Sequence, residues 1–317
     1  MSELVWRPAG PADAAGITDL FRAIESAAPL GLETERAEVG ARMSRPGLDL
    51  RVDTVVAVDA ADAISAYAET ADMGTGQGRA RIRLTCAVRP GLDDQITGAT
   101  LDWLLTRARQ LLSEHHPGLP GVLGARCAAV DHSRLGLLGQ AGFEVVFRLQ
   151  DLVRGVTPPL SVAPPAGITI TGYDLRFDEA ARVAHNDAYA DDPGALLPDA
   201  RGWPLHATGL ATFLPEGSFL ALTAAEEIAG FLFSLGHHDG AGVREGTLLC
   251  LGTRVPWRRR GIAAALIGRA LAAYRLVGIT TARLEVEDTN TSATRLYHRL
   301  GFTDSDRGYA ILQAPVP

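Results

Sequence analysis

Three consecutive arginines and a glycine stand directly before a helical pattern in the second half of the chain. They are Arg258, Arg259, Arg260 and Gly261. Arginine supplies positive charge, and glycine has no Cβ that would keep a ligand away from the backbone. From Ile262 onward apolar residues recur at helical spacing, and a helix N-terminus presents free N–H groups and the positive end of its dipole. This is the chemistry of a diphosphate cradle, although an arginine run before a helix is also typical of a solvated surface.

The elements expected around these residues alternate between strand and helix. Residues 247–255 favour a mostly buried strand. The helix after the arginines ends at Gly278, residues 283–287 alternate like a strand, and a second helix covers about 292–300. Gly301 closes this second helix and is followed by Phe302. The order is therefore strand, anion-binding loop, helix, strand, helix and Gly-Phe turn. We refer to residues 258–264 as the anion loop.

This order of elements, with Tyr297 shortly before Gly301 and Phe302, resembles the acyl-CoA site of the GNAT superfamily of N-acetyltransferases. The resemblance covers residues 168–317. It implies an α+β fold, a mixed α/β sandwich in which a mixed, splayed central sheet is flanked by helices. It also implies acetyl-CoA as co-substrate.

The resemblance assigns roles to individual residues. The anion loop would hold the CoA diphosphate through backbone N–H groups, the strand end before it would pair with the pantetheine arm, and Asn290 would contact that arm. Tyr297 would protonate the departing thiolate; a half-buried core aromatic is the alternative interpretation. The cofactor-binding residues expected in this way are Thr253, Arg254, Val255, Arg258, Arg259, Arg260, Gly261, Ile262, Ala263, Ala264 and Asn290.

The general base is harder to place. Relatives often carry a glutamate inside the strand before the loop, but residues 247–253 contain no carboxylate. Glu245, just before them, is the nearest substitute and our first candidate. His237 and His238 are alternatives because histidine titrates near neutral pH. A water chain could also serve, and a surface position is an alternative interpretation for all three side chains.

The acceptor pocket is expected within residues 185–219, a polar and aromatic stretch between helical patterns, because such loops often carry recognition. Asp187 and Asp191 could attract a cationic amine, and Trp203 could line the pocket. A helix end with capping aspartates explains the same carboxylates equally well.

The N-terminal half repeats the pattern without its chemistry. Gly142 and Phe143 match Gly301 and Phe302, but Leu138 stands where the second copy has Tyr297. The loop at residues 91–98 carries two aspartates, which are electrostatically unfavourable for a diphosphate.

We therefore expect two tandem GNAT-like domains: a degenerate one over residues 1–155 and a catalytic one over residues 168–317. The Pro-rich residues 156–167 would join them as a semi-rigid linker. In layout this resembles tandem GNAT proteins with one working site, such as mycothiol synthase.

The composition of the chain limits the classes of partner that we expect it to bind. A net charge of −7 argues against nucleic acid and is compatible with a cationic substrate. No long apolar run or signal peptide is evident, so we expect a cytoplasmic protein without membrane contact, a monomer or a homodimer. The scattered Cys86, Cys127 and Cys250 lack metal-ligand spacing, so we expect free buried thiols and no metal.

Together these observations favour an acetyl-CoA-dependent N-acetyltransferase that transfers acetyl directly to an amine of a small molecule. Acceptor classes considered are an aminoglycoside, an amino sugar or a biosynthetic intermediate. The alternatives are a non-catalytic acyl-CoA-binding or regulatory protein of the same fold and a protein N-acetyltransferase. Tyr297 favours the enzyme, whereas the missing strand carboxylate slightly favours the binding protein.

Overall fold

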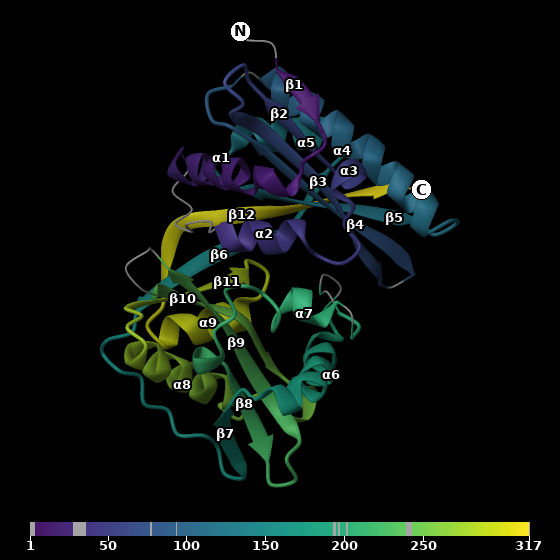
Figure 1. The fold of residues 1–317 in the computed structure, drawn as a ribbon. Helices are drawn as coiled ribbons and strands as arrows, with labels where there is room; N and C mark the ends of the chain where they lie inside the picture. The colour runs from purple at the N-terminus through teal and green to yellow at the C-terminus, as the bar shows by residue number, and fades with distance from the viewer. Residues whose placement is uncertain are drawn as a thin grey trace. The chain divides into compact units, whose positions relative to one another are not determined.

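The structure is a computed structural model that describes residues 4–27, 36–76, 78–92, 94–192, 195, 197–200, 202–238 and 243–316. Contacts divide the chain into two units (Figure 1). The first comprises Met1–Leu149 and Arg307–Pro317, and the second comprises Gln150–Asp306. Among the described residues, no helix has the length and apolar character needed to cross a membrane.

The first unit is built on a mixed sheet whose strand order is β1-β2-β3-β4-β5-β12. Most neighbours are antiparallel, but β4 and β5 are parallel, and helix α4 connects them. The strands are β1 (Val5–Arg7), β2 (Thr54–Val58), β3 (Ile64–Gly76), β4 (Arg79–Val88), β5 (Gly121–Ala128) and β12 (Thr303–Val316). The helices are η1 (Pro11–Asp13), α1 (Ala14–Ala27), α2 (Arg36–Met43), α3 (Leu50–Asp53), α4 (Asp94–His115) and α5 (His132–Gln140).

Helix α4 packs on this sheet through one apolar stripe. Leu101, Leu104, Ala108 and Leu111 recur at helical spacing and are buried in the same cluster as sheet residues such as Ile82. The N-terminal half therefore has a hydrophobic core of its own, which is what a separately folding domain requires.

The second unit has the strand order β6-β11-β10-β9-β8-β7. Strands β7 to β10 are antiparallel neighbours, whereas β10 and β11 are parallel. The strands are β6 (Glu144–Gly155, of which residues 150–155 belong here), β7 (Ile168–Gly172), β8 (Phe219–Thr223), β9 (Ile228–His238), β10 (Val243–Thr253) and β11 (Thr281–Glu287). The helices are η2 (Leu175–Phe177), α6 (Asp178–Tyr189), α7 (Trp203–His206), η3 (Pro215–Gly217), η4 (Val255–Trp257), α8 (Ile262–Leu276) and α9 (Thr291–Arg299).

Helices cover both faces of the second sheet. Residues of α8 and α9 share one buried cluster, and residues of α6 and α7 share another (Figure 1). The prediction of a mixed sheet flanked by helices is thus confirmed. Helix α8 begins at Ile262 as its periodicity predicts, and Gly278, with φ of 82°, follows its end.

The two units differ in two places from the expected domain boundaries at residues 155 and 168. Residues 307–317 group with the first unit, because Tyr309 to Val316 of β12 pair antiparallel with β5. Residues 150–155 of β6 group with the second unit. The Pro-rich segment packs on the second unit, where the carbonyl of Leu160 lies over Gly268 of α8. The pairing of β12 with β5 joins strands far apart in sequence, and such pairing leaves no local sequence pattern from which it could be predicted.

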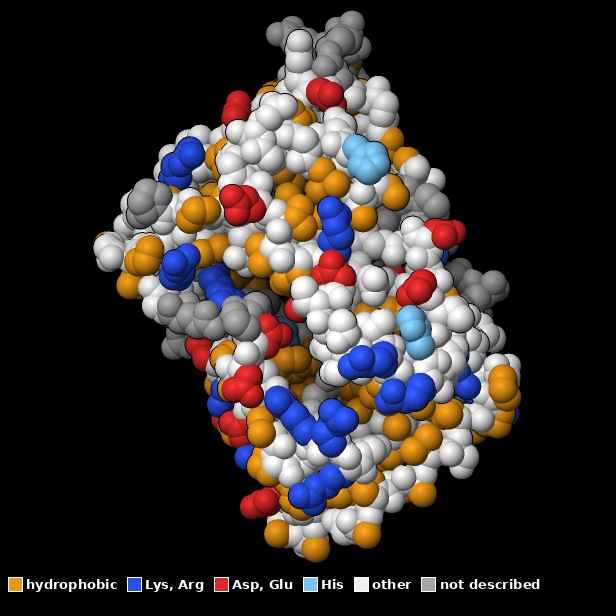
Figure 2. Space-filling view, turned by 180° about the vertical axis from the view of Figure 1, so that it is seen from behind, with side chains coloured by type: hydrophobic (Ala, Val, Ile, Leu, Met, Phe, Trp, Pro, Cys, Tyr) orange, Lys and Arg blue, Asp and Glu red, His pale blue; other side chains and the backbone are white. Residues whose placement is uncertain are grey.

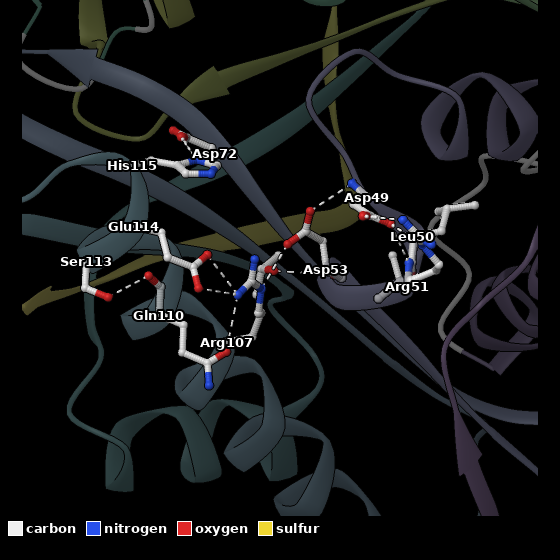
Figure 3. A network of polar contacts seen from close by, with 12 residues as sticks. Asp49, Leu50, Arg51, Asp53, Asp72, Arg107, Gln110, Ser113, Glu114 and His115 are labelled. Atoms are coloured by element: carbon white, nitrogen blue, oxygen red, sulfur yellow. Dashed lines mark hydrogen bonds and ion pairs between the residues drawn. The ribbon is translucent and has the colours of Figure 1, made fainter.

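A buried ion pair fixes α3 to α4 in the first unit (Figure 3). The Arg107 Nε donates to Asp53 Oδ1 at 3.0 Å, and its Nη1 also reaches Glu114 at 3.1 Å. The other Asp53 oxygen accepts from the backbone N–H of Asp49 at 2.9 Å. Both Arg107 and Asp53 side chains are largely shielded from water.

Replacing Arg107 by leucine should therefore destabilise the first unit. The variant leaves the Asp53 carboxylate buried without a counter-ion, a loss that typically costs about 3 kcal/mol. Urea denaturation should show a lower midpoint for the Arg107→Leu variant. The Arg51→Leu variant is the matched control, because the Arg51 pair with Asp49 is exposed, and its midpoint should stay unchanged. Equal midpoints for the two variants would contradict a structural role for Arg107.

Candidate active site

Strands β10 and β11 pair over only a short length. Their parallel register covers Glu245 to Thr247 of β10, although β10 continues to Thr253 and β11 to Glu287. A β-bulge between Leu248 and Cys250, on the side that faces β9, marks the same point. Beyond Thr247, the β11-facing edge of β10 has no strand partner in the described part of the chain. We call this opening the splay; its closed end is at residues 245–247.

The anion loop follows the open end of the splay. Arg259 and Gly261 have left-handed backbones, with φ of 65° and 86°, and Gly261 caps the N-terminus of α8. A Cβ built on Gly261 would meet no atom within 4 Å, so a ligand can approach this backbone freely. The first N–H groups of α8 have no intrahelical acceptor. The loop therefore has the geometry that a diphosphate requires.

The arginines of the loop are used in different ways. The Arg258 guanidinium donates to the carbonyl of Ala188 at 2.9 Å and to that of Thr253 at 3.2 Å, so it braces the loop against the end of α6. Arg260 lies over the ring of Trp257, 4.8 Å from its centroid. Figure 2 shows arginine side chains, which are the blue ones because the chain has no lysine, gathered on one face of the second unit.

Asp187 and Asp191 were expected to attract a substrate amine. Both carboxylates pair instead with arginines of this region. Asp187 lies 2.7 Å from Arg254, and Asp191 lies 3.7 Å from Arg258. These ion pairs offset the negative charge that a cationic acceptor would need. Asp187 is thus paired with the residue that follows β10, and Asp191 lies near the first arginine of the anion loop.

The expectation that Trp203 lines the acceptor pocket is corrected by its burial. Its side chain is 1% exposed, its indole N–H donates to Asp178 at 2.8 Å, and its ring packs edge-on against Phe233. A polar and aromatic sequence suggested a recognition loop, but the aromatic ring belongs to the core under α6.

Asn290 and Tyr297 lie on α9. The Asn290 side chain caps the helix by accepting from the backbone N–H of Ala293 at 3.1 Å. Tyr297 is buried beside Phe302, and burial raises the pKa of its phenol to about 12. Tyr297 is therefore protonated at neutral pH and can act as a proton donor.

A second phenol, which the sequence did not single out as a site residue, lies at the splay. The Tyr189 hydroxyl, from α6, donates to the carbonyl of Leu251 on β10 at 3.1 Å. Burial, with Cys250 and Tyr297 nearby, raises the pKa of Tyr189 well above its ordinary value. The two phenols come from helices on opposite faces of the sheet and converge near one stretch of β10. The one sequence feature that could have indicated Tyr189 as a site residue is its position one helical turn after His185.

Glu245 lies inside β10 at the closed end of the splay, not before the strand as expected. Its two oxygens accept from Arg283 Nε at 2.9 Å and Nη2 at 3.2 Å, and Arg283 also pairs with the buried Asp151. The alternative base His237 stands opposite Glu245 on β9, with its ring 3.3 Å from the Thr247 hydroxyl. The side chain of His238 lies outside the described residues.

Glu287, at the end of β11, is a further carboxylate that the sequence did not single out as a candidate base. Burial, reinforced by Asp192 and Asp288, raises its pKa. A carboxylate with a raised pKa accepts protons more readily near neutral pH.

The first unit has a related splay that a side chain occupies. Strands β4 and β5 pair over Ala80 to Leu84 of β4, although β4 continues to Val88. There Arg134 of α5 donates to the carbonyl of Cys86 at 2.9 Å. In addition, α4 begins at Asp94, whose carboxylate accepts from Ser133 at 2.6 Å. Asp93 lies outside the described residues. A side chain thus takes the strand edge that a pantetheine arm would need.

Comparison with known proteins agrees with this geometry. Residues 182–302 match the family described as "Acetyltransferase (GNAT) family". Mycothiol acetyltransferase of Thermobispora bispora is 30% identical over 67% of this chain and 68% of its own length. That of Geodermatophilus obscurus is 28% identical over 92% of both chains. With that of Streptomyces scabiei the identity is 32%, and the chain spans about half of that relative, 55% of its length.

Solved structures show the same fold over the whole chain. A GCN5-related N-acetyltransferase from Sphaerobacter thermophilus has a TM-score of 0.75 at 23% identity, covering 99% of this chain and 96% of its own. A tandem GNAT protein from the clavulanic acid biosynthesis pathway has a TM-score of 0.69 at 15% identity, covering 99% and 98%. The splay, the anion loop and these likenesses agree: the chain belongs to the GNAT family of acetyltransferases.

Proposed function

We propose that the second unit transfers acetyl from acetyl-CoA directly to an amine of a small molecule, and that the acceptor is the desacetylated form of mycothiol or a closely related amino sugar. The observation that carries the proposal is the splay, which ends at the anion loop and has two phenols converging on it. The choice of acceptor comes from the relatives, which are named mycothiol acetyltransferases.

Acetyl-CoA fits the splay from the loop inward. The diphosphate would bind the N–H groups at the start of α8, with Arg259 and Arg260 adding charge. The pantetheine amides would pair with the free edge of β10 as an added strand. An arm that follows β10 away from the loop brings the thioester toward the closed end of the splay, where Glu245 lies.

The transfer needs a proton donor and a proton acceptor. The acceptor amine attacks the thioester carbonyl, the carbon–sulfur bond breaks, and the thiolate takes a proton from Tyr297. The amine loses its own proton to a base. Glu245 remains our first candidate by position, and its carboxylate is paired with Arg283. Glu287, whose pKa is raised by burial, is the second candidate.

A thiol-release assay with acetyl-CoA tests the proposed function. The panel contains desacetylated mycothiol, glucosamine, an aminoglycoside and a peptide with a free N-terminus. We expect the highest kcat/KM with the first of these. Release with the peptide alone would indicate a protein N-acetyltransferase. Tight binding of acetyl-CoA without release on any amine would indicate a binding protein.

The Gly261→Asp variant should lose acetyl-CoA binding, because it adds a side chain and a negative charge where the diphosphate would lie. Calorimetry with acetyl-CoA measures the loss. The matched control is Gly91→Asp, since Gly91 has a similar φ of 83° and equally open surroundings in the first unit. The control should bind one equivalent with unchanged affinity. A weaker control, or two comparable sites in the unmodified chain, would contradict a single site in the second unit.

The Tyr297→Phe variant should lower kcat about 10²- to 10⁴-fold and leave the KM for acetyl-CoA nearly unchanged. The ring and its packing on Phe302 are retained, and only the proton donor is removed. The Tyr189→Phe variant is the control for loss of a buried hydroxyl at the same strand. Steady-state kinetics should show a much smaller loss of kcat for Tyr189→Phe. The reverse order would make Tyr189 the acid.

The pH–rate profile should identify the base. A base must be unprotonated, so a raised pKa moves the loss of activity at acid pH to a higher pH than for an ordinary carboxylate. If Glu287 is the base, Glu287→Gln removes this limb, whereas Glu245→Gln keeps it. If Glu245 is the base, the two results exchange. Circular dichroism of Glu245→Gln controls for the loss of its pairing with Arg283. Two unchanged profiles would leave His237 or water as the acceptor.

A further inference from the structure

Two histidines and a cysteine from three separate elements meet beside β10. They are His185 of α6, His206 of α7 and Cys250 of β10. The two Nε2 atoms are 3.0 Å apart, and Cys250 Sγ lies 3.9 Å from His206 Nε2. The three ligand atoms all lie within 4.8 Å of one another. We call these residues the His-His-Cys cluster.

Neighbouring bonds determine which nitrogen of His185 carries its proton. The Asn186 amide nitrogen donates to the carbonyl of Pro198 at 3.0 Å, which fixes the amide so that its oxygen faces His185. That oxygen lies 3.1 Å from His185 Nδ1, so Nδ1 must be the protonated nitrogen. The neutral ring then presents an unprotonated Nε2 to the other two residues. Metal-binding histidines are commonly accompanied by a carbonyl that accepts from the other ring nitrogen and fixes the tautomer in this way.

The surroundings of the cluster are aromatic and largely buried. His185 is 2% exposed, Cys250 is also buried, and the rings of Tyr189, Trp203 and Phe231 lie around His185. Imidazole nitrogen and cysteine sulfur are ligand atoms that zinc prefers.

We propose that His185 Nε2, His206 Nε2 and Cys250 Sγ bind one Zn²⁺ ion, with a fourth position open to water. Tetrahedral zinc with its usual bond lengths separates such ligand atoms by about 3.3 to 3.6 Å. The observed 3.0 and 3.9 Å lie on either side of that range, and His185 Nε2 and Cys250 Sγ lie within 4.8 Å of each other, so side-chain rotations must bring the three atoms to the ion. On binding, the Cys250 thiol releases its proton to solvent and a zinc–sulfur bond forms. Without metal, the pair of imidazoles shares one hydrogen bond.

This proposal goes beyond acetyl transfer and departs from the expectation of no metal. That expectation rested on the spacing of the cysteines, whereas the cluster joins side chains far apart in sequence. The site adjoins the splay, since the Tyr189 ring packs against His185 at a tilt and its hydroxyl donates to the carbonyl of Leu251. An ion here would stiffen the α6 side of the splay.

The test uses the full chain with any affinity tag removed, because tags bind metal. After treatment with a chelator and dialysis against Zn²⁺, elemental analysis should find one zinc per chain. Titration with Co²⁺ should give a thiolate-to-cobalt band and the visible bands of four-coordinate cobalt. Unmodified protein that keeps its fold but retains no zinc and leaves the Co²⁺ spectrum unchanged would overturn the proposal, leaving only a hydrogen-bonded histidine pair.

Variants identify the ligands. Cys250→Ser should lose the thiolate-to-cobalt band, and His206→Gln should lose zinc. Asn186→Ala should weaken zinc binding about 10- to 100-fold, because it no longer orients His185. Cys127→Ser is the matched control, since Cys127 is a buried free thiol of the first unit, and it should bind zinc normally. Loss of zinc in Cys127→Ser with retention in Cys250→Ser would place the metal elsewhere.

Discussion

The geometry of the candidate site in the second unit depends on one pair of strands, β10 and β11, whose pairing covers only a short length. Strands β10 and β11 exchange backbone hydrogen bonds next to Glu245 and then separate, which leaves peptide groups of β10 without a strand partner. Such groups are costly when they are buried and unpaired. The Tyr189 hydroxyl satisfies part of this edge, and in the proposed function a ligand that resembles a strand would pair with the rest. The opening would then supply both the specificity for a peptide-like arm and the path to the acetyl group.

The first unit shows what happens when the same edge is satisfied internally. Arg134 donates to the carbonyl of Cys86, so the chain itself provides the partner that the second unit leaves to a ligand. The fold is retained, with its own core around α4, while a side chain of the unit itself takes the strand edge. The two units thus differ in a few side chains at this edge and much less in the sheet.

Local patterns in the sequence predicted the structural features that depend on residues close together in the chain. Helical spacing placed α8 and α9 to within a few residues, and Gly301 marked the end of α9, because periodicity and caps act over one or two turns. Partners distant in sequence were not predictable. Asp187 pairs with Arg254, and the burial of Trp203 depends on strands formed later in the chain. The buried pairing of Glu245 with Arg283 was equally invisible, since it requires the register of β10 against β11.

The placement of β12 has a consequence for synthesis on the ribosome. Tyr309 to Val316 supply the outer neighbour of β5, yet they emerge long after Gly121 to Ala128. The nascent first unit must therefore wait with an open β5 edge while the entire second unit is translated. An open edge is a template for pairing with another chain, and slow closure extends that exposure. The β5 edge is thus closed only after the second unit has been translated, and a polypeptide released before β12 would be prone to association.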